Sequence, residues 1–118
     1  MNPQFVHLRL HTEFSLVDSV VRVPELLAAT RAAGMPAVAV TDQNNLFAMV
    51  KFYREALGQG IKPIIGVDLQ VAEGSERRGS SRLTLLCQNQ EGYRNATRLV
   101  TRAYLEGQKS GTPLVERA

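Results

Sequence analysis

The chain has 118 residues, of which 44% are hydrophobic, and this is enough for one domain at most or for part of one. Lysine and arginine number 14 against 11 aspartate and glutamate residues, an excess too small to identify a nucleic-acid-binding protein unless the charges cluster. The one cysteine, Cys87, excludes an internal disulfide and a zinc site built from several thiolates, so we expect a reducing cytoplasm. No apolar run approaches the roughly 18 residues that span a bilayer, so no membrane association is expected.

The first predicted element is a strand over residues 5–11. Leu8 and Leu10 alternate there with Arg9 and His11, as a half-buried strand requires. Arg9 and His11 are therefore expected to project from the same side of this strand.

A short helix is predicted next, over Val23–Ala33. Pro24 stands where proline is favoured at helix starts, and Gly34 suits a left-handed C-terminal cap. The continuous apolar run Pro36–Val40 is typical of a parallel strand covered on both faces. It ends abruptly in the polar residues 41–45, which predicts polar side chains crowded at a strand end.

A second helix is predicted after this strand, capped by Asn44 or Asn45 and ended by Gly58 or Gly60. It is expected to pack through one side, whose apolar residues recur at helical spacing: Leu46, Met49, Val50, Tyr53 and Leu57.

The rest of the chain predicts two strands and a third helix. The strands, Ile61–Val71 and Arg82–Gln88, are expected to form a hairpin across the polar segment Glu73–Ser81. The helix is expected from Glu91 to about Leu105, with a buried side formed by Tyr93, Ala96, Leu99 or Val100, Ala103 and Tyr104. Residues 107–118 show no periodicity.

The predicted order of elements is β-α-β-α-β-β-α. Strands that alternate with helices favour parallel pairing with right-handed crossovers, so the chain is assigned to the α/β class. In parallel β/α folds, functional residues gather where strands end and loops begin. His11, Asp42, Gln43 and Asp68 all stand at such ends and are the candidate functional residues.

The pair Arg9 and His11 raises the question of a metal site. Two histidines at these positions would present two imidazoles to one ion. An arginine stays protonated and has no lone pair to give, so Arg9 opposes a divalent cation. His11 is read either as a ligand or as a hydrogen-bonded histidine at a strand end.

The other polar candidates also have two readings. Gln43 offers only a neutral carbonyl oxygen, which is a poor ligand for zinc or manganese. Asp42, Asp68 and the loop residue Asp18 are each either carboxylates of a site or ordinary turn and cap residues.

Taken together, these segments resemble a known family. The sequences FVHLRLHTEFSLVD (residues 5–18), GMPAVAVTDQNNLF (34–47) and GIKPIIGVD (60–68) closely resemble the N-terminal polymerase-and-histidinol-phosphatase (PHP) domain of bacterial DNA polymerase III alpha subunits. The likeness continues through LTLL (83–86), EGYRN (91–95) and AYLEG (103–107).

This resemblance implies a distorted β/α barrel of PHP type, with residues 1–118 as the incomplete N-terminal portion of the domain. In the complete domain, His, Asp and Glu side chains hold several metal ions at the strand ends. His11 and Asp18 match ligand positions, Asp68 replaces a Glu, and Arg9 and Gln43 replace histidines.

A hydrolytic site needs a metal held by at least about three protein groups. The degenerate set of His11, Asp18 and Asp68, opposed by Arg9, leads us to expect no cofactor and no hydrolysis by this chain. Arg9 is expected to pair instead with Asp18, Asp68 or Asp42, replacing the bridging role of a metal.

Two functions follow from the resemblance. In the first, the chain is a structural and docking module of a replicative DNA polymerase, whose absent magnesium-dependent polymerase module performs template-directed synthesis. Its expected partners are the remaining polymerase domains, the proofreading exonuclease and, through the full-length protein, DNA. The alternative is a metal-dependent phosphoesterase, an exonuclease or pyrophosphatase, whose manganese or zinc site is completed beyond residue 118. An incomplete barrel also leaves a strand edge unpaired, so self-association is expected.

Three arginines recur at four-residue intervals in the last predicted helix. Arg94, Arg98 and Arg102 therefore form a basic stripe on its exposed side. The stripe is either a solvated helix face or a contact with nucleic-acid phosphate or another part of the polymerase.

Overall fold

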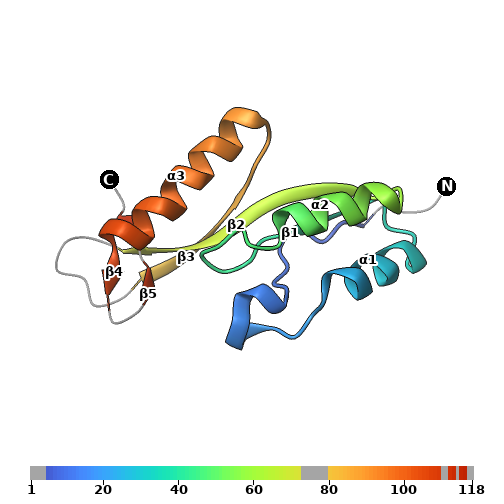
Figure 1. Cartoon of the computed structure of the whole chain (residues 1–118), viewed down its shortest axis with the longest axis horizontal. Coiled ribbons are helices and arrows are strands. Elements are labelled where there is room, and N and C mark those ends of the chain that lie inside the picture. The colour runs from blue at the N-terminus through green and yellow to red at the C-terminus, as the bar shows by residue number, and fades with distance from the viewer. Residues whose placement is uncertain (1–4, 73–79, 110–111, 114, 117–118) are drawn as a thin grey trace.

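The structure is a computed structural model that describes residues 5–72, 80–109, 112–113 and 115–116; the side chains of residues 16–18, 72, 80 and 108–116 are outside this description. The helices are the 3-10 helix η1 (Glu13–Asp18), α1 (Val23–Ala32), α2 (Met49–Gly58) and α3 (Gln90–Glu106). The strands are β1 (Ala37–Val40), β2 (Lys62–Ala72), β3 (Ser80–Leu86), β4 (Gln108–Lys109), β5 (Thr112–Pro113) and β6 (Val115–Glu116). Figure 1 shows this arrangement.

The sheet is organised around the long strand β2. Its first half pairs in parallel with β1, from Ala37 opposite Lys62 to Val40 opposite Ile65. Its second half pairs antiparallel with β3 as a hairpin. The predicted parallel pairing and the predicted hairpin are both confirmed, and most of the predicted connecting loop, Glu73–Ser81, lies outside the described residues.

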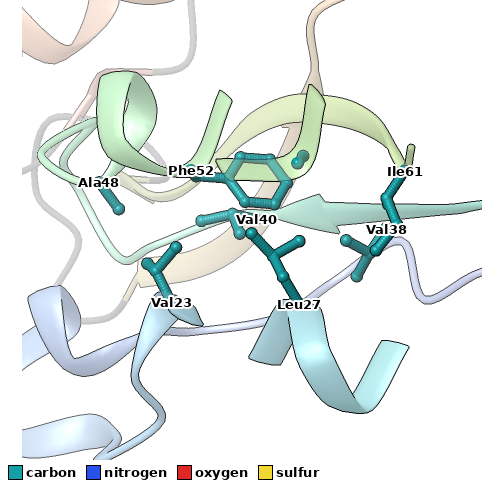
Figure 2. Close-up of a cluster of buried hydrophobic side chains, with 8 residues drawn as sticks. Val23, Leu27, Val38, Val40, Ala48, Phe52 and Ile61 are labelled. Atoms are coloured by element: carbon teal, nitrogen blue, oxygen red, sulfur yellow. The ribbon is translucent and has the colours of Figure 1, made fainter. Parts of the chain in front are cut away.

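All three α-helices pack on one face of the sheet. Val38 and Val40 of β1 lie in a cluster with Leu27 of α1 and Phe52 of α2, which Figure 2 shows pointing toward one another. Further along β2, Val67 and Leu69 are buried with Ala96 of α3. Because side chains alternate along a strand, Asp68 and Gly66 belong to the opposite face.

The predicted first strand is wrong in detail. Residues 5–12 run beside β1, but they form no regular strand. Ala39 donates its backbone N–H to the carbonyl of His7 (2.9 Å), and Thr41 donates to that of Leu10 (2.8 Å). The donors are two residues apart and the acceptors three, so one extra residue in the N-terminal segment breaks the ladder. The Thr41 hydroxyl oxygen accepts the N–H of Leu10 instead (2.9 Å).

Helix α2 begins later and packs through a different side than predicted. It starts at Met49, and its start has no side-chain cap, because Asn45 Oδ1 accepts the Phe47 N–H in the preceding turn (3.0 Å). The buried residues of α2 are Phe52 and Ala56. The small residue Ala56, one turn after Phe52, lets the helix lie close to the sheet. The predicted packing residues Val50, Tyr53 and Leu57 are exposed.

The other predicted elements hold with smaller changes. Helix α3 buries Ala96 and Ala103 and half-buries Tyr93, as predicted, whereas Tyr104 is 40% exposed. The C-terminal residues, expected to be irregular, include β6, which pairs in parallel with Val71 and Ala72 of β2. None of the helices in the described part of the chain is long and apolar enough to cross a membrane.

Candidate functional site

Asp68 stands at the centre of the candidate site because the pairing of β1 and β2 continues past the end of β1. The backbone N–H of Asp68 donates to the Asp42 carbonyl (3.0 Å), and the Asp68 carbonyl accepts the N–H of Asn44 (2.7 Å). Asn44 has a positive φ of 57°, a conformation that asparagine tolerates better than most residues. This extension turns the chain over Asp68 and leaves its side chain with no exposed surface.

The buried Asp68 carboxylate is held by three side chains. Arg9 Nε donates to Oδ2 at 2.9 Å, His11 Nε2 lies 2.6 Å from the same oxygen, and the Thr84 hydroxyl donates to Oδ1. The Arg9 side chain is 51% exposed and that of His11 12% exposed, so of these two partners Arg9 is the one that faces solvent. A carboxylate buried without such partners would be strongly destabilising, and these three side chains supply its hydrogen bonds.

Gln43 lies next to Asp68 in the sheet. The two residues form a parallel bridge, so their side chains leave the same face on neighbouring strands. The Gln43 backbone N–H donates to Ser15 Oγ (2.9 Å). The structure thus brings Arg9, His11, Gln43 and Asp68 together beyond the end of β1. The prediction that Asp68 stands at a strand end is wrong, because β2 continues to Ala72 through its pairing with β3.

Asp42 performs a different task from Asp68. It is buried, and its Oδ1 accepts the Thr12 N–H (2.5 Å) and the Ser15 hydroxyl (2.8 Å), while its Oδ2 accepts the Thr12 hydroxyl (2.8 Å). All three donors come from a segment about thirty residues earlier. Asp42 therefore anchors the start of η1 to the end of β1, a longer-range role than the turn or cap reading suggested.

Thr12, Ser15 and Thr84 are the site residues that sequence reasoning missed. The spacing of Thr12 and Ser15 around η1 carries no distinct motif. Thr84 faces Asp68 only through the hairpin register, which pairs these two residues directly. That register depends on the length of the hairpin loop and cannot be read from either strand alone.

The described residues do not fit a bound metal. Within them, no three His, Cys, Asp or Glu side chains come together as a ligand group. Both Asp68 oxygens are already engaged, one of them by a guanidinium that cannot ligate. The side chain of the third expected ligand, Asp18, lies outside the described residues, so the set of His11, Asp18 and Asp68 stays a prediction.

Comparison with known proteins decides the family. Residues 7–118 match the family model of the PHP domain. The chain is a member of the PHP domain family. Its relatives include DNA polymerase III alpha subunits that are 56% identical over 117 residues in Pseudomonas aeruginosa, 44% identical over 117 residues in Vibrio cholerae and 41% identical over 115 residues in Escherichia coli K12.

These alignments include 98–99% of this PHP chain but only 10% of each relative. The chain thus spans about one tenth of the length of the alpha subunits it matches. Among solved structures, an amidohydrolase from Chromobacterium violaceum aligns with a TM-score of 0.54 at 16% identity, covering 80% of this chain and 32% of that one. This likeness concerns the fold, and it confirms the expected α/β class and partial barrel.

Away from the strand ends, the PHP chain carries the predicted basic stripe. Arg94, Arg98 and Arg102 are all exposed on α3. Arg102 Nε lies 3.6 Å from Glu106 Oε1, an exposed pair one helical turn apart that adds little stability. The exposure is as predicted, and a contact with nucleic acid or with a partner stays a prediction.

Proposed function

We propose that this chain is the N-terminal PHP part of a DNA polymerase III alpha subunit, where it serves as a structural and docking module with a degenerate metal site. The full-length protein would perform template-directed DNA synthesis in the cytoplasm, with magnesium in its polymerase module. The identities of 41–56% to alpha subunits over nearly the whole chain support this assignment. The remaining polymerase domains, the proofreading exonuclease and DNA are the proposed partners.

The observation that carries the structural role is the position of the Arg9 guanidinium. In a hydrolytic site, a metal would share the Asp68 carboxylate and lower the pKa of a bound water. Here Arg9 Nε and His11 Nε2 both lie on Asp68 Oδ2. A fixed cation neutralises the buried carboxylate, and it offers no open coordination position at which a water could be activated.

Metal dependence of folding tests this role. The variant Arg9→His removes the fixed cation and supplies an imidazole beside His11. We expect the melting temperature of this variant to fall in chelator and to recover when manganese or zinc is added. The melting temperature of the unchanged chain should stay the same in both treatments. An Arg9→His melting temperature that is the same as that of the unchanged chain in chelator would contradict the substitution of metal by arginine.

The alternative function is a metal-dependent phosphoesterase completed by residues beyond position 118. It is favoured by the presence of two ligand types, the imidazole of His11 and the carboxylate of Asp68, at one place (2.6 Å apart). Metal analysis of the full-length protein separates the two functions. Stoichiometric manganese or zinc, together with phosphate-ester cleavage that His11→Ala abolishes, would establish the phosphoesterase and reject the scaffold.

A further inference from the structure

Strand β3 lies at an edge of the sheet. In the described part of the chain it pairs with β2 alone, while β1 and β6 pair with β2 on the other side. Cys87 donates its backbone N–H to the Ile65 carbonyl (2.7 Å), which makes residues 65 and 87 a hydrogen-bonded pair. Such pairs alternate along an antiparallel ladder, so every second residue of β3 turns its backbone groups away from β2. The residues that do so are Arg82, Thr84 and Leu86.

The edge of β3 is apolar and has little protection against further pairing. Leu83 is 48% exposed and Leu86 41%, although Leu85 packs in the cluster under α3. Exposed strand edges are usually protected by a proline, a lysine or a bulge. Strand β3 pairs with β2 in one regular register from Ser80 to Leu86, and its only charged residue is Arg82. A further strand can therefore add to this edge.

The edge of β3 matches a second copy of itself in the antiparallel direction. A two-fold axis at Thr84 places the two Thr84 residues opposite each other and Arg82 opposite Leu86 of the second copy. These are the residues whose backbone groups point outward, so each outward N–H meets a carbonyl. In the same register Leu83 lies opposite Leu85 of the second copy, in a non-hydrogen-bonded pair, where side chains are closest. One register thus serves both the backbone groups and the exposed leucines.

We propose that two copies of this chain associate edge to edge through β3, antiparallel about a two-fold axis at Thr84. The occupant is a second copy because one register pairs all the outward backbone groups and also covers Leu83. Seven residues form an edge about 24 Å long, which buries less than the roughly 1,200–2,000 Å² of stable interfaces. The dissociation constant is therefore micromolar or above. This inference goes beyond the proposed function and does not rest on it, and it gives the self-association expected from the sequence a specific strand and register.

A single cysteine substitution tests the register. Position 81 would lie opposite Cys87 of the second copy, in a non-hydrogen-bonded pair with Cα atoms about 4.5 Å apart, which a disulfide can span. Ser81→Cys should therefore form a covalent dimer in oxidised glutathione, and adding Cys87→Ala should abolish it. Arg82→Cys is the matched control, because its side chain lies on the opposite face of the strand from Cys87. The control should give no more covalent dimer than the unchanged chain.

Sedimentation equilibrium of the 118-residue chain tests the affinity. Leu83→Lys places a charge in both symmetry-related leucine contacts and should raise the dissociation constant by about tenfold or more. The matched control is Leu105→Lys, on α3, where the side chain is 78% exposed. The control should leave the dissociation constant unchanged. Both variants should keep the melting temperature of the unchanged chain, since neither residue is buried.

Three results would each overturn the edge-to-edge dimer. The first is a chain that stays monomeric at millimolar concentration. The second is Arg82→Cys forming as much covalent dimer as Ser81→Cys, which would show random collision or another register. The third is an effect of Leu83→Lys on the dissociation constant no larger than that of Leu105→Lys. If Leu83→Lys fails to fold, the comparison of Ser81→Cys with Arg82→Cys still decides, because both of those residues are exposed.

Discussion

Arg9 Nε and Asp68 Oδ2 lie 2.9 Å apart although 59 residues separate them in the chain. The contact joins the irregular N-terminal segment to the middle of β2. Because the Arg9 side chain is 51% exposed and Asp68 is fully buried, water screens the pair only partly. The segment that runs beside β1 is thus held to the sheet by a charge as well as by backbone hydrogen bonds.

We expect Arg9→Met to lower the free energy of unfolding by about 1–2 kcal/mol, because the apolar stem is kept while the buried carboxylate loses its cation. Urea denaturation measures this loss. The control is Arg22→Met, which removes an exposed arginine whose Nε is 4.0 Å from Glu13 Oε1 and should cost less than about 0.5 kcal/mol. Equal losses in the two variants would show that the Arg9 contact is an ordinary surface pair.

Asp42→Asn should lower the free energy of unfolding by about 2–3 kcal/mol. The amide keeps the size of the side chain, but it has only one acceptor oxygen for three donors and loses the charge that strengthens those hydrogen bonds. Amide hydrogen exchange should become faster over residues 12–15 first. Glu25→Gln on the exposed side of α1 is the matched control, and unchanged exchange at Thr12 in Asp42→Asn would refute the anchoring role.

Gly66→Ala should be among the most damaging small substitutions in β2. An added Cβ would lie 2.5 Å from the Leu85 carbonyl oxygen and 2.9 Å from Thr41 Cγ2, so the strands would have to move apart. We expect a loss of about 3 kcal/mol in thermal or urea unfolding. Gly58→Ala is the control: nothing lies within 4 Å of its added Cβ, and alanine should be neutral or stabilising by up to about 1 kcal/mol at that helix end. A tolerated Gly66→Ala would mean that β2 and β3 are less closely packed than described.

Cys87 should make stability fall at alkaline pH. Burial raises the pKa of its thiol above the ordinary value of 9.0, so the folded chain keeps its proton where the unfolded chain has lost it. The free energy of unfolding therefore decreases as pH rises from the unfolded pKa through the folded one. Urea titrations between pH 8 and 10 should show this decrease, and Cys87→Ala should lack it. Iodoacetamide should alkylate the folded chain more slowly than the denatured chain; equal rates would contradict the burial of the thiol.

Local patterns in the sequence predicted most of the architecture, and the failures have physical causes. The run Pro36–Val40 and the hairpin strands were predictable because buried strands need apolar residues and turns need polar ones. The buried side of α2 could not be predicted, because the apolar residues of this helix cover a wide arc. Whether Phe52 or Tyr53 points inward depends on the sheet beneath the helix. Periodicity likewise cannot show the extra residue that keeps residues 5–11 from forming a strand.

The site was predictable as a location but not as a set of contacts. The end of β1 identified Gln43. His11 and Asp68 were also named as strand-end residues, and they do lie beside Gln43, although Asp68 falls within β2 and His11 belongs to no regular strand. The partner of Arg9 was left open among three aspartates, and the structure selects Asp68. Choosing among them required the hydrogen-bonded register of β1 with β2, which brings Asp68 and not Asp42 to the face that Arg9 reaches.

Strand β2 has eleven residues and extends about 36 Å at the usual rise per residue. Two residues of β2, Ile65 and Val67, belong to different apolar clusters. Ile65 packs in the cluster covered by α1 and α2, and Val67 packs in the cluster covered by α3. Asp68 therefore lies near the boundary between two regions, the one covered by α1 and α2 and the one covered by α3, which would otherwise unfold locally and independently of each other. A disturbance of its carboxylate, from Arg9 in the irregular N-terminal segment or from Thr84 on β3, should reach both regions at once. The protection of backbone amides against hydrogen exchange in α1 and in α3 should therefore fall together.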